Sequence, residues 1–456
     1  MKSIPVDYKH SLVGWWGNYA SELMTEYQQS IEEGLDISAY ENVFKEAAKL
    51  PDSEGKAKIA DGLFDIILNA KTVDGYKYNE PSDLEGIKAL RKKTLPPLNF
   101  TKVPKNKIEG AWYGRIAGCL LGKPMEGIRY ADFTNFLKAS GNYPMSRYVK
   151  HAELTKELCD IANYDLLNKW KAHCYIDNLE YAPFDDDTNY VVMNCLAVER
   201  YGRDFSPFLM ADMWLRMQPK EAYCTAERVA YSNFIKGYNP PYSAIYKNPY
   251  REWIGAQIRG DYFGYCNPGD TEAAAKMAFN DACISHIKNG IYGEMWAAAT
   301  IAAAAVCDDP RLAILYGMEE IPATSRLYEA LENAVRNYDN GMSEEEWFAD
   351  FHKRWDDKNS HHWCHTISNA EVCAAALLYG KGDYAKCVCI AVQNGFDTDC
   401  NGATVGSICG IMNGIEGIGK EWYENLNGTL ETSLCTYAKV SIDEFVKKTM
   451  DHIDAK

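Results

Sequence analysis

The amino-acid sequence predicts an all-α protein that consists of one large helical domain preceded by an N-terminal helical extension. From residue 108 onward, one Ala-rich helical pattern follows another, and Gly, Pro and Asn mark the loops between them. Runs that alternate β-branched and polar residues are scarce, so a fold based on a sheet is not expected. Two segments repeat glycine every four residues, which favours helices that pack very closely.

The predicted extension covers residues 1–105. Within it, residues 39–50 carry apolar side chains at the spacing of a core-facing helix, namely Tyr40, Val43, Phe44 and Ala47. Residues 94–107 contain three prolines and show no periodicity, and prolines are excluded from helix interiors. We therefore place a boundary there, assign residues 106–456 to the large domain, and expect that domain to fold without the extension.

The composition limits the classes of partner. The chain has 456 residues, 47% of them hydrophobic, and a formal net charge of −16. The negative charge argues against nucleic acid or an anionic membrane surface as the main partner, because both attract basic patches. The first residues lack the apolar run of a signal peptide, and the most apolar stretch, residues 295–306, is too short to span a bilayer. The 15 cysteines are scattered, as is typical of reduced thiols, so we expect a cytoplasmic protein.

The glycine repeats stand at positions 110, 114, 118 and 122 and again at 402, 406, 410 and 414. Four-residue spacing puts the glycines on one side of a helix, where each costs about 1 kcal/mol relative to Ala. Such a cost is understandable if another backbone must approach that side. We therefore predict two central helices that press against each other in the core.

Three adjacent aspartates, Asp185, Asp186 and Asp187, come directly before an apolar helical segment at residues 190–198. Aspartate at a helix start can cap free N–H groups and is stabilised by the helix dipole. Capping explains one or two of the three, but three consecutive like charges repel one another unless a cation lies among them. Both a capping role and a metal-binding role are open for this cluster.

A second acidic pair, Asp397 and Asp399, precedes the second glycine-striped helix. Residues two apart point in different directions within a helix, so the two carboxylates can converge only in the turn before it. Two acidic helix starts in one core strengthen the metal-binding interpretation. Ligands made only of oxygen favour Mg²⁺ or Mn²⁺ over zinc.

Glu126 follows the first glycine-striped helix, in the sequence Gly-Lys-Pro-Met-Glu-Gly at residues 122–127. The glycine ends the helix and the proline prevents its continuation, so Glu126 is expected in a tight loop at the helix end. Taken alone, a glutamate in such a loop is more often a surface residue than a catalytic one.

Two further patterns suggest other sites. His361, His362, Cys364 and His365 could form a zinc cluster or a Cys–His nucleophile, but adjacent residues do not easily turn toward one ion. A group of tyrosines predicts either a packed surface loop or an aromatic wall that stacks on a planar group. These residues are Tyr238, Tyr242, Tyr246, Tyr250, Tyr262 and Tyr265.

The order of these motifs resembles the ADP-ribosylglycohydrolase family. The shared order is a glycine-striped helix with Gly-x-Pro-x-Glu, then Asp-Asp-Asp-Thr-Asn, then Asp-Thr-Asp-Cys-Asn with the second glycine-striped helix. Residues 248–259, 285–294 and 365–370 are also similar to a bacterial branch of this family. The resemblance covers roughly residues 106–450 and leaves residues 1–105 outside.

This resemblance implies an all-α domain that binds two Mg²⁺ ions, with Mn²⁺ as the alternative. Such an enzyme hydrolyses the bond between the anomeric carbon of a ribosyl group and a nitrogen or oxygen leaving group. Glu126 and Asp187 are implied to be catalytic, and Asp186, Asp187, Asp397 and Asp399 to bind metal; we add Asp185 to the predicted metal ligands. Two metals can orient the ribose hydroxyls and deliver a water, and a carboxylate can act as the acid or base.

The same resemblance implies a set of substrate-binding residues. They are Asn189, Arg259, Asp261, His286, Asn289, Gly290, Tyr292, His365 and Asn369. For Arg259 and Asp261, a buried ion pair is the alternative interpretation.

Two positions depart from the family pattern: Asp185 and Cys400 stand where familiar members have threonine metal ligands. These departures leave open the leaving group and the choice between an ADP-ribosylated protein and a small riboside. The predicted partner is a ribosyl or ADP-ribosyl substrate, without nucleic acid or membrane, and a homo-oligomer stays open. The alternative function is an inactive family member that binds ADP-ribose or serves as a scaffold.

Overall fold

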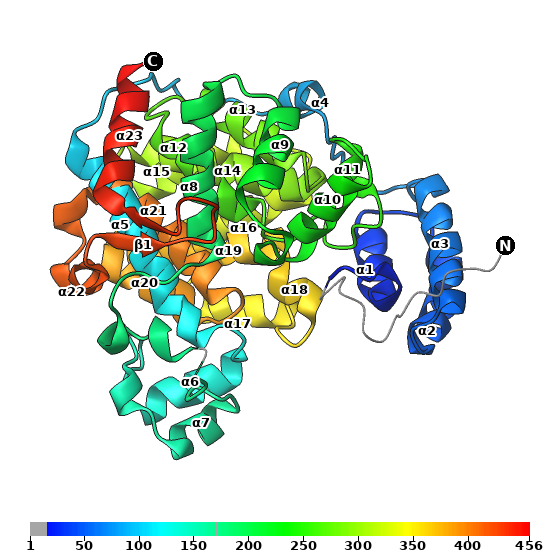
Figure 1. Cartoon of the computed structure of the whole chain (residues 1–456), viewed down its shortest axis with the longest axis horizontal. Helices are drawn as coiled ribbons and strands as arrows, with labels where there is room; N and C mark the ends of the chain where they lie inside the picture. Colours follow the sequence, from blue (N-terminus) through cyan, green and yellow to red (C-terminus); the bar gives the residue numbers. More distant parts are fainter. Residues whose placement is uncertain (1–15, 170) are drawn as a thin grey trace.

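The computed structural model describes residues 16–169 and 171–456, and these form the predicted all-α fold (Figure 1). The extension contains α1 (Leu23–Glu32), α2 (Glu41–Lys49), α3 (Glu54–Asn69) and α4 (Leu84–Ala89). The large domain contains α5 (Lys105–Gly122), α6 (Tyr130–Ala139), α7 (Lys156–Ala162), α8 (Asp186–Tyr201), α9 (Pro207–Met217), α10 (Thr225–Ile235), α11 (Tyr242–Ile245), α12 (Asp261–Tyr265), α13 (Thr271–Ala282), α14 (Lys288–Ala304), α15 (Pro310–Met318), α16 (Arg326–Asp339), α17 (Glu344–Arg354), α18 (Ser360–Cys364), α19 (Thr366–Gly380), α20 (Tyr384–Gln393), α21 (Thr398–Asn413), α22 (Lys420–Tyr423) and α23 (Ile442–Asp454).

The two glycine-striped helices, α5 and α21, pack against each other at the centre of the domain, as the sequence predicts. A Cβ atom added to Gly118 would lie 2.0 Å from the carbonyl oxygen of Gly402, and one added to Gly410 would lie 2.0 Å from that of Gly110. Only hydrogen fits between backbones at this separation. The glycines therefore let α5 and α21 bring their ends together, and these ends carry Glu126 and Asp397.

Gly406 offers a direct test of this packing. A Cβ atom at Gly406 would lie 2.2 Å from the carbonyl oxygen of Gly114, and backbone cannot move aside as a side chain can. We expect Gly406→Ala to lower the free energy of unfolding by about 3 kcal/mol, the upper part of the range for overpacking.

The matched control is Gly62→Ala on the exposed side of α3, where an added Cβ meets no atom within 4 Å. Because Ala favours helix more than Gly does, Gly62→Ala should raise stability by up to about 1 kcal/mol. Urea unfolding of both variants checks the prediction. Equal stability of Gly406→Ala and the wild-type chain would show that α5 and α21 can separate without cost.

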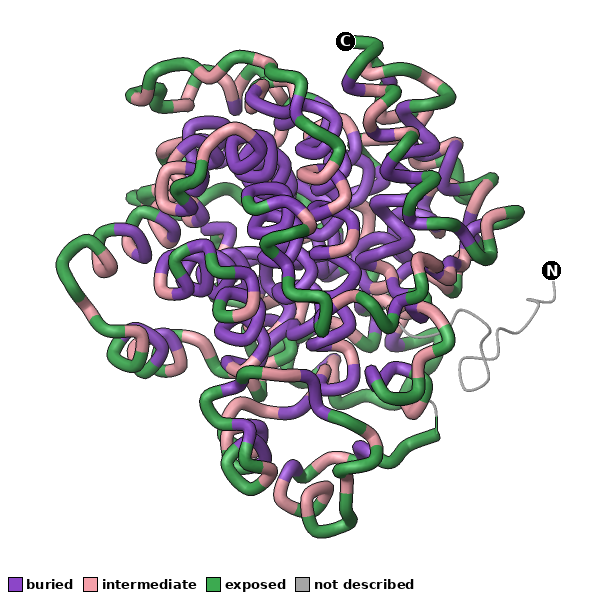
Figure 2. Tube along the Cα trace, turned by 90° about the vertical axis from the view of Figure 1, so that its left-hand side faces the viewer, coloured by how far each residue is buried: buried purple, intermediate pink, exposed green. Residues whose placement is uncertain are grey.

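The remaining core surrounds this helix pair. Residues 295–305 are buried throughout, so the most apolar stretch of the sequence is a core helix. Figure 2 shows the buried residues concentrated in the middle of the domain and the exposed ones around it. In the described part of the chain, no helix has the length and apolarity needed to cross a membrane.

A short β-ribbon near the C-terminus positions the segment before α8. Strands β1 (Thr429–Glu431) and β2 (Lys439–Ser441) pair antiparallel, with Leu430 opposite Val440. Ala182 joins the edge of β1: its N–H donates to the carbonyl of Thr429, and its carbonyl accepts from the N–H of Glu431. The ribbon therefore fixes the chain three residues before Asp185.

The extension has a small apolar core of its own, built by α1 to α3 on one side of the molecule (Figure 1). Phe44 and Ala47 belong to this core as predicted, whereas Tyr40 and Val43 are 39% and 47% exposed. The predicted four-residue face is thus wrong for these two, because Tyr40 lies in a separate 3₁₀ turn before α2 and Val43 lies on its outer face. Residues 1–15, also part of the predicted extension, lie outside the described residues.

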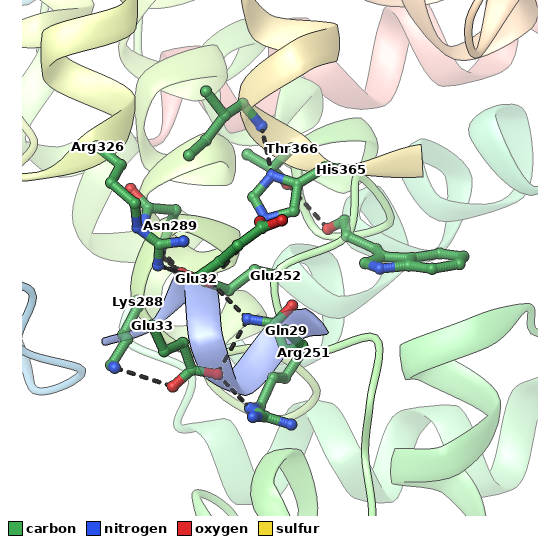
Figure 3. A network of polar contacts seen from close by, with 12 residues as sticks. Gln29, Glu32, Glu33, Arg251, Glu252, Lys288, Asn289, Arg326, His365 and Thr366 are labelled. Carbon is green, nitrogen blue, oxygen red and sulfur yellow. Dashed lines mark hydrogen bonds and ion pairs between the residues drawn. The ribbon is translucent and has the colours of Figure 1, made fainter. Parts of the chain in front are cut away.

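A buried polar network joins the extension to the large domain (Figure 3). Arg251 of the domain donates to Glu26 at 2.7 Å and to Glu33 at 2.5 Å, and all three side chains are at most 5% exposed. Gln29 of α1 donates to Glu252 at 2.6 Å. Each part therefore supplies partners for buried charges of the other. Folding of the large domain without the extension stays a prediction.

Candidate metal centre

The first aspartate cluster lies at the start of α8, and Asp185 caps that helix. One carboxylate oxygen of Asp185 accepts from the N–H of Asp187 at 3.0 Å, and the Thr188 hydroxyl accepts from the N–H of Asp185 at 3.2 Å. Of the two roles that the sequence left open, capping is therefore present for Asp185. The cap uses one carboxylate oxygen of Asp185. Metal binding by this residue stays a prediction.

α5 and the turn after it meet this cluster through three residues spaced four apart: Arg115 and Cys119 of the helix and Lys123 directly after it. Arg115 donates to a carboxylate oxygen of Asp187 at 3.1 Å, and Lys123 forms an ion pair with Asp185. Burial disfavours the charge of Lys123, but the Asp185 carboxylate outweighs burial and raises the lysine pKa well above its usual range. None of the three was predicted from the sequence, because their partners lie more than 60 residues away along the chain.

The second acidic pair lies at the start of α21. Asp397 and Asp399 are each 5% exposed. The Asn369 side-chain oxygen accepts from the N–H of Asp397 at 3.2 Å, and the Cys364 thiol lies 3.7 Å from an Asp397 carboxylate oxygen. Asn369, predicted to bind substrate, thus holds the backbone of a predicted metal ligand.

Glu126 lies half-buried in the turn after α5 and faces the same carboxylates. The charge of Asp399 and burial raise the pKa of Glu126 to about 8, although Lys171 and Lys123 act in the opposite direction. The Lys171 ammonium donates to the backbone carbonyl of Glu126 at 2.9 Å. The position of Glu126 therefore differs from that of an isolated surface glutamate.

The carboxylates of the centre shift the pKa values of one another. Burial and the neighbouring acids raise the pKa of Asp186, Asp397 and Asp399. Burial also raises the pKa of Asp187, against the effect of Arg115. Asp185 is the exception, because Lys123 overcomes burial and lowers its pKa. Buried carboxylates that lie this close together can all be ionised only if cations lie among them.

Two carboxylate oxygens of the centre have no hydrogen-bond partner within residues 16–169 and 171–456. They are Oδ2 of Asp187 and Oδ1 of Asp399, both in side chains that are at least nine-tenths buried. A buried carboxylate oxygen without a donor is costly, and a divalent cation would satisfy it. The residues present therefore fit the Mg²⁺ or Mn²⁺ that the sequence predicted.

The possible ligand atoms form two sets of three. Cys119, Asp185 and Asp187 each offer one atom within 4.8 Å of the others, and so do Asp397, Asp399 and Cys400. The metal ligands predicted from the sequence were all carboxylate oxygens. The structure differs, because a thiol from α5 and a thiol from α21 lie in ligand range of the carboxylates.

A third set, Glu32, His361 and His365, lies where α1 meets α18. Trp253 donates its ring N–H to Nδ1 of His361 at 3.0 Å, and the N–H of Ile367 donates to Nδ1 of His365 at 3.1 Å. Both rings therefore carry their proton on Nε2, and a protonated nitrogen cannot bind a metal. The set is better described as a hydrogen-bonded contact, with His361 donating to Glu32 at 3.1 Å.

This contact predicts a pH-dependent contribution to stability. Burial favours the neutral form of Glu32, but His361 and His365 outweigh burial and lower the pKa of Glu32 from 4.5 to about 2. A carboxylate with a depressed pKa stabilises the fold above its unfolded pKa and loses this effect as the pH falls toward the folded pKa. The contribution is at most about 3 kcal/mol.

We expect Glu32→Gln to be less stable than the wild-type chain above pH ~5, with the difference disappearing as the pH approaches ~2. Urea unfolding at several pH values measures it. Glu46→Gln serves as the control for a lost charge, because Glu46 and its partner Lys49 on α2 are 72% and 68% exposed in their side chains. A stability difference that is constant from pH 7 to pH 3 would contradict the lowered pKa of Glu32.

The predicted substrate-binding residues fall in different places. Asn189 exchanges hydrogen bonds with Ser433 of the C-terminal ribbon at 2.8 and 3.0 Å. Asn289 donates to Glu80 and Glu252 at 2.8 Å, and Tyr292 donates to the carbonyl of Pro81. These last two residues contact the extension or the network that holds it.

His365 and Gly290 lie in the same region. His365 Nε2 is 3.9 Å from Glu252, and an added Cβ at Gly290 would meet the carbonyl oxygen of Arg251 at 2.7 Å. Burial lowers the pKa of His365 to about 3. Substrate binding by these residues stays a prediction.

Arg259, Asp261 and His286 lie in the core behind the centre. Arg259 binds Glu227 at 2.8 Å and Asp281 at 2.7 Å, with no exposure of its side chain, so Arg259 is in a buried ion pair, but with other partners than Asp261. Asp261 pairs with Arg115 and thereby connects to Asp187. His286 is also completely buried.

The tyrosines between residues 238 and 265 separate into two groups. Tyr250, Tyr262 and Tyr265 are buried in the core. Tyr238 and Tyr246 stack with ring centroids 4.2 Å apart, and with Tyr242 they line a surface pocket that Phe64 and Leu68 of the extension also border. The first group cannot stack on a ligand, and the second lies beside the extension.

Aromatic and basic side chains contact the loop that carries Glu126 or lie beside the acidic residues in the chain, and we call them the rim. The Lys171 ammonium lies 4.9 Å from the ring centre of Tyr164, and the Arg129 guanidinium lies 6.0 Å from the ring of Trp363. Phe184, next to Asp185, is 48% exposed. Such a rim can hold a planar or anionic part of a ligand above the carboxylates.

Comparison with known proteins supports the resemblance seen in the motifs. A family model described as ADP-ribosylglycohydrolase matches residues 101–452. The chain is also similar to a solved structure titled "ADP-ribosylglycohydrolase-related protein complex", with 16% identity, a TM-score of 0.49, and coverage of 77% of this chain and 98% of that chain. No curated protein matches the sequence. The family model covers the helices that build the acidic centre, and the chain therefore belongs to the ADP-ribosylglycohydrolase family.

Proposed function

We propose that this chain is a divalent-cation-dependent hydrolase that cleaves the glycosidic bond of a ribosyl group. One observation carries the proposal: the ends of α5, α8 and α21 bring six carboxylates together, and two buried oxygens among them have no partner in the described chain. The ligands would be Asp185, Asp186, Asp187, Asp397 and Asp399. The family resemblance implies two Mg²⁺ ions, with Mn²⁺ as the alternative.

The roles of the protein groups follow from their positions. Bound divalent cations orient the hydroxyls of a ribose and polarise a water. Glu126, with a pKa raised to about 8, can hold a proton near neutral pH and exchange it with the water or the leaving group. Asp187 is held by Arg115, so it keeps its orientation during the reaction. Asn369 fixes the backbone of Asp397 on the opposite side.

The rim supports a substrate with a planar or phosphate-bearing part. Lys171 and Arg129 supply positive charge near Glu126, and Trp363 and Phe184 supply aromatic surface. An ADP-ribosyl conjugate has both chemical features, and a small riboside has only the planar one. We propose a ribosyl or ADP-ribosyl substrate on this ground, with no nucleic acid or membrane as partner.

A mass-spectrometric screen tests this function. The full chain with Mg²⁺ or Mn²⁺ is incubated with ADP-ribosylated amino acids, ADP-ribosyl esters and small N- and O-ribosides. Release of ADP-ribose or ribose above the level of Glu126→Gln supports the proposal. No release from any of these classes, with metal shown to be bound, would overturn it.

One observation favours an alternative, a family member that binds ADP-ribose without cleaving it. Arg115 and Lys123 already neutralise Asp187 and Asp185, so the first half of the centre can be stable without a metal. Titration of Mn²⁺ separates the two functions. An inactive binder should retain ADP-ribose binding in the absence of any divalent cation.

A further inference from the structure

The two halves of the acidic centre differ in charge balance. In the first half, Arg115 binds Asp187 and Lys123 binds Asp185. In the second half, no ion pair to Asp397 or Asp399 exists within the part of the chain that the structure describes. A cation added to the centre therefore gains most from the second half, where the negative charge has no fixed partner.

The second half also contains an open ligand position. Oδ1 of Asp399 has no hydrogen-bond partner among the described residues, and Asp399 is only 5% exposed. Cys400 follows directly in the first turn of α21 and is 6% exposed. Its sulfur and one oxygen each of Asp397 and Asp399 lie within 4.8 Å of one another.

These distances suit a mixed oxygen and sulfur site. Metal–oxygen bonds of about 2.0–2.2 Å and a metal–sulfur bond of about 2.3 Å place ligand atoms roughly 3.5 Å apart in a tetrahedral site. Oδ2 of Asp187, which also lacks a partner in the described chain, belongs to a residue close enough to Cys400 to affect it electrostatically.

We infer that Asp397, Asp399 and Cys400 form a carboxylate–thiolate site that binds thiophilic divalent cations, such as Zn²⁺, Co²⁺ or Cd²⁺, more tightly than Mg²⁺. This inference rests on the proposed function, because it concerns the same metal centre. Binding breaks the S–H bond of Cys400, forms a metal–sulfur bond and releases the proton to solvent, with no change of oxidation state. Thiolate ligands select such ions, whereas Mg²⁺ and Mn²⁺ bind through oxygen.

The first thiol, Cys119, is expected to behave differently. Its carboxylate neighbours Asp185 and Asp187 are already bound by Lys123 and Arg115, so a cation entering there must displace an ammonium or a guanidinium. Cys119 and Cys400 are therefore a matched pair. They are both buried thiols within reach of two aspartates, and they differ in whether the aspartates already have cationic partners.

The test uses the full chain, freed of metal by a chelator, and Co²⁺ as a spectroscopic probe. A thiolate–cobalt bond gives a charge-transfer band in the near ultraviolet. We expect this band in the wild-type chain and in Cys119→Ser, and its loss in Cys400→Ser. Competition titrations should show Zn²⁺ affinity reduced at least about tenfold in Cys400→Ser, with Mn²⁺ affinity unchanged or higher. Cys400→Thr gives a second oxygen variant, and circular dichroism confirms that both are folded.

The outcomes separate this inference from the proposed function. A band that persists in Cys400→Ser and Cys400→Thr, or wild-type protein that binds Mn²⁺ but gives no band, would overturn the thiolate site and leave the proposed function standing. Wild-type protein that binds neither Co²⁺ nor Mn²⁺ would overturn both. Loss of the band in Cys119→Ser instead would move the site to the first half of the centre and contradict the charge argument.

Discussion

Replacing Glu126 with Gln is expected to lower turnover of a ribosyl substrate by at least about 100-fold, the scale of a lost acid–base group. Glutamine has the same size and keeps the hydrogen-bonding shape of the side chain, but it cannot accept or release a proton at neutral pH. The pKa of Glu126, raised to about 8 by Asp399 and by burial, makes its carboxyl suited to proton exchange near neutrality. The Lys171 contact is to the backbone carbonyl of Glu126, so the loop should keep its conformation.

Steady-state kinetics at saturating metal measure this effect, with Mn²⁺ binding measured on the same samples. Glu109→Gln is the matched control, because Glu109 lies near the start of α5, far from the loop that carries Glu126, and pairs with Lys105. The control should retain full turnover. If Glu126→Gln kept its activity within a factor of about three, Glu126 would be no more than a residue of the rim.

The largest loss of stability is expected from Arg251→Met. This change removes the partner of two buried carboxylates, Glu26 and Glu33, which are 0% and 5% exposed in their side chains. Removing one member of a buried ion pair typically costs about 3–5 kcal/mol, because the remaining charge has lost its compensation. Lys288 still binds Glu33 at 2.9 Å, so Glu26 bears most of the loss.

Arg311→Met provides the control. Arg311 pairs with Asp339 at 2.6 Å, but these side chains are 38% and 40% exposed, and such pairs contribute roughly 0–1 kcal/mol. Urea unfolding followed by circular dichroism compares the two variants. Equal stability of Arg251→Met and Arg311→Met would mean that the extension does not depend on its charged contacts with the domain.

Part of this architecture could be predicted from the sequence because it depends on local chemistry. A glycine every four residues has few explanations other than close approach of a backbone, and α5 and α21 meet in that way. Acidic residues at helix starts are also local features, and both clusters begin helices as expected. The order of the motifs then indicated the family.

The partners of these motifs could not be predicted in the same way. Lys123 and Arg115 meet Asp185 and Asp187 across more than 60 residues of sequence, and no local pattern links them. The contacts between the extension and the large domain could not be predicted from local sequence either. Residues 285–294 supply four of the predicted substrate-binding residues, but Asn289 donates to Glu80 and the neighbouring Lys288 pairs with Glu33 at the end of α1.

Asp185 shows why the role of an aspartate at a helix start, as a cap or as a metal ligand, depends on more than the local sequence. The sequence allowed either a helix cap or a metal ligand. The structure shows the cap. It also shows an ion pair to Lys123, which the sequence pattern around Asp185 does not predict. Whether a residue also binds metal depends on the free oxygens around it, and this depends on the tertiary structure.

The most direct measurement of the central claim is hydrolysis by metal-free protein to which a divalent cation is returned in steps. Wild-type chain stripped by a chelator should cleave no ribosyl bond, and activity should rise in proportion to bound Mg²⁺ or Mn²⁺. A variant with Asp397→Asn and Asp399→Asn should stay inactive at the same cation concentration, because it lacks the carboxylates of the second half. Full hydrolysis by protein shown to be free of metal would contradict the account.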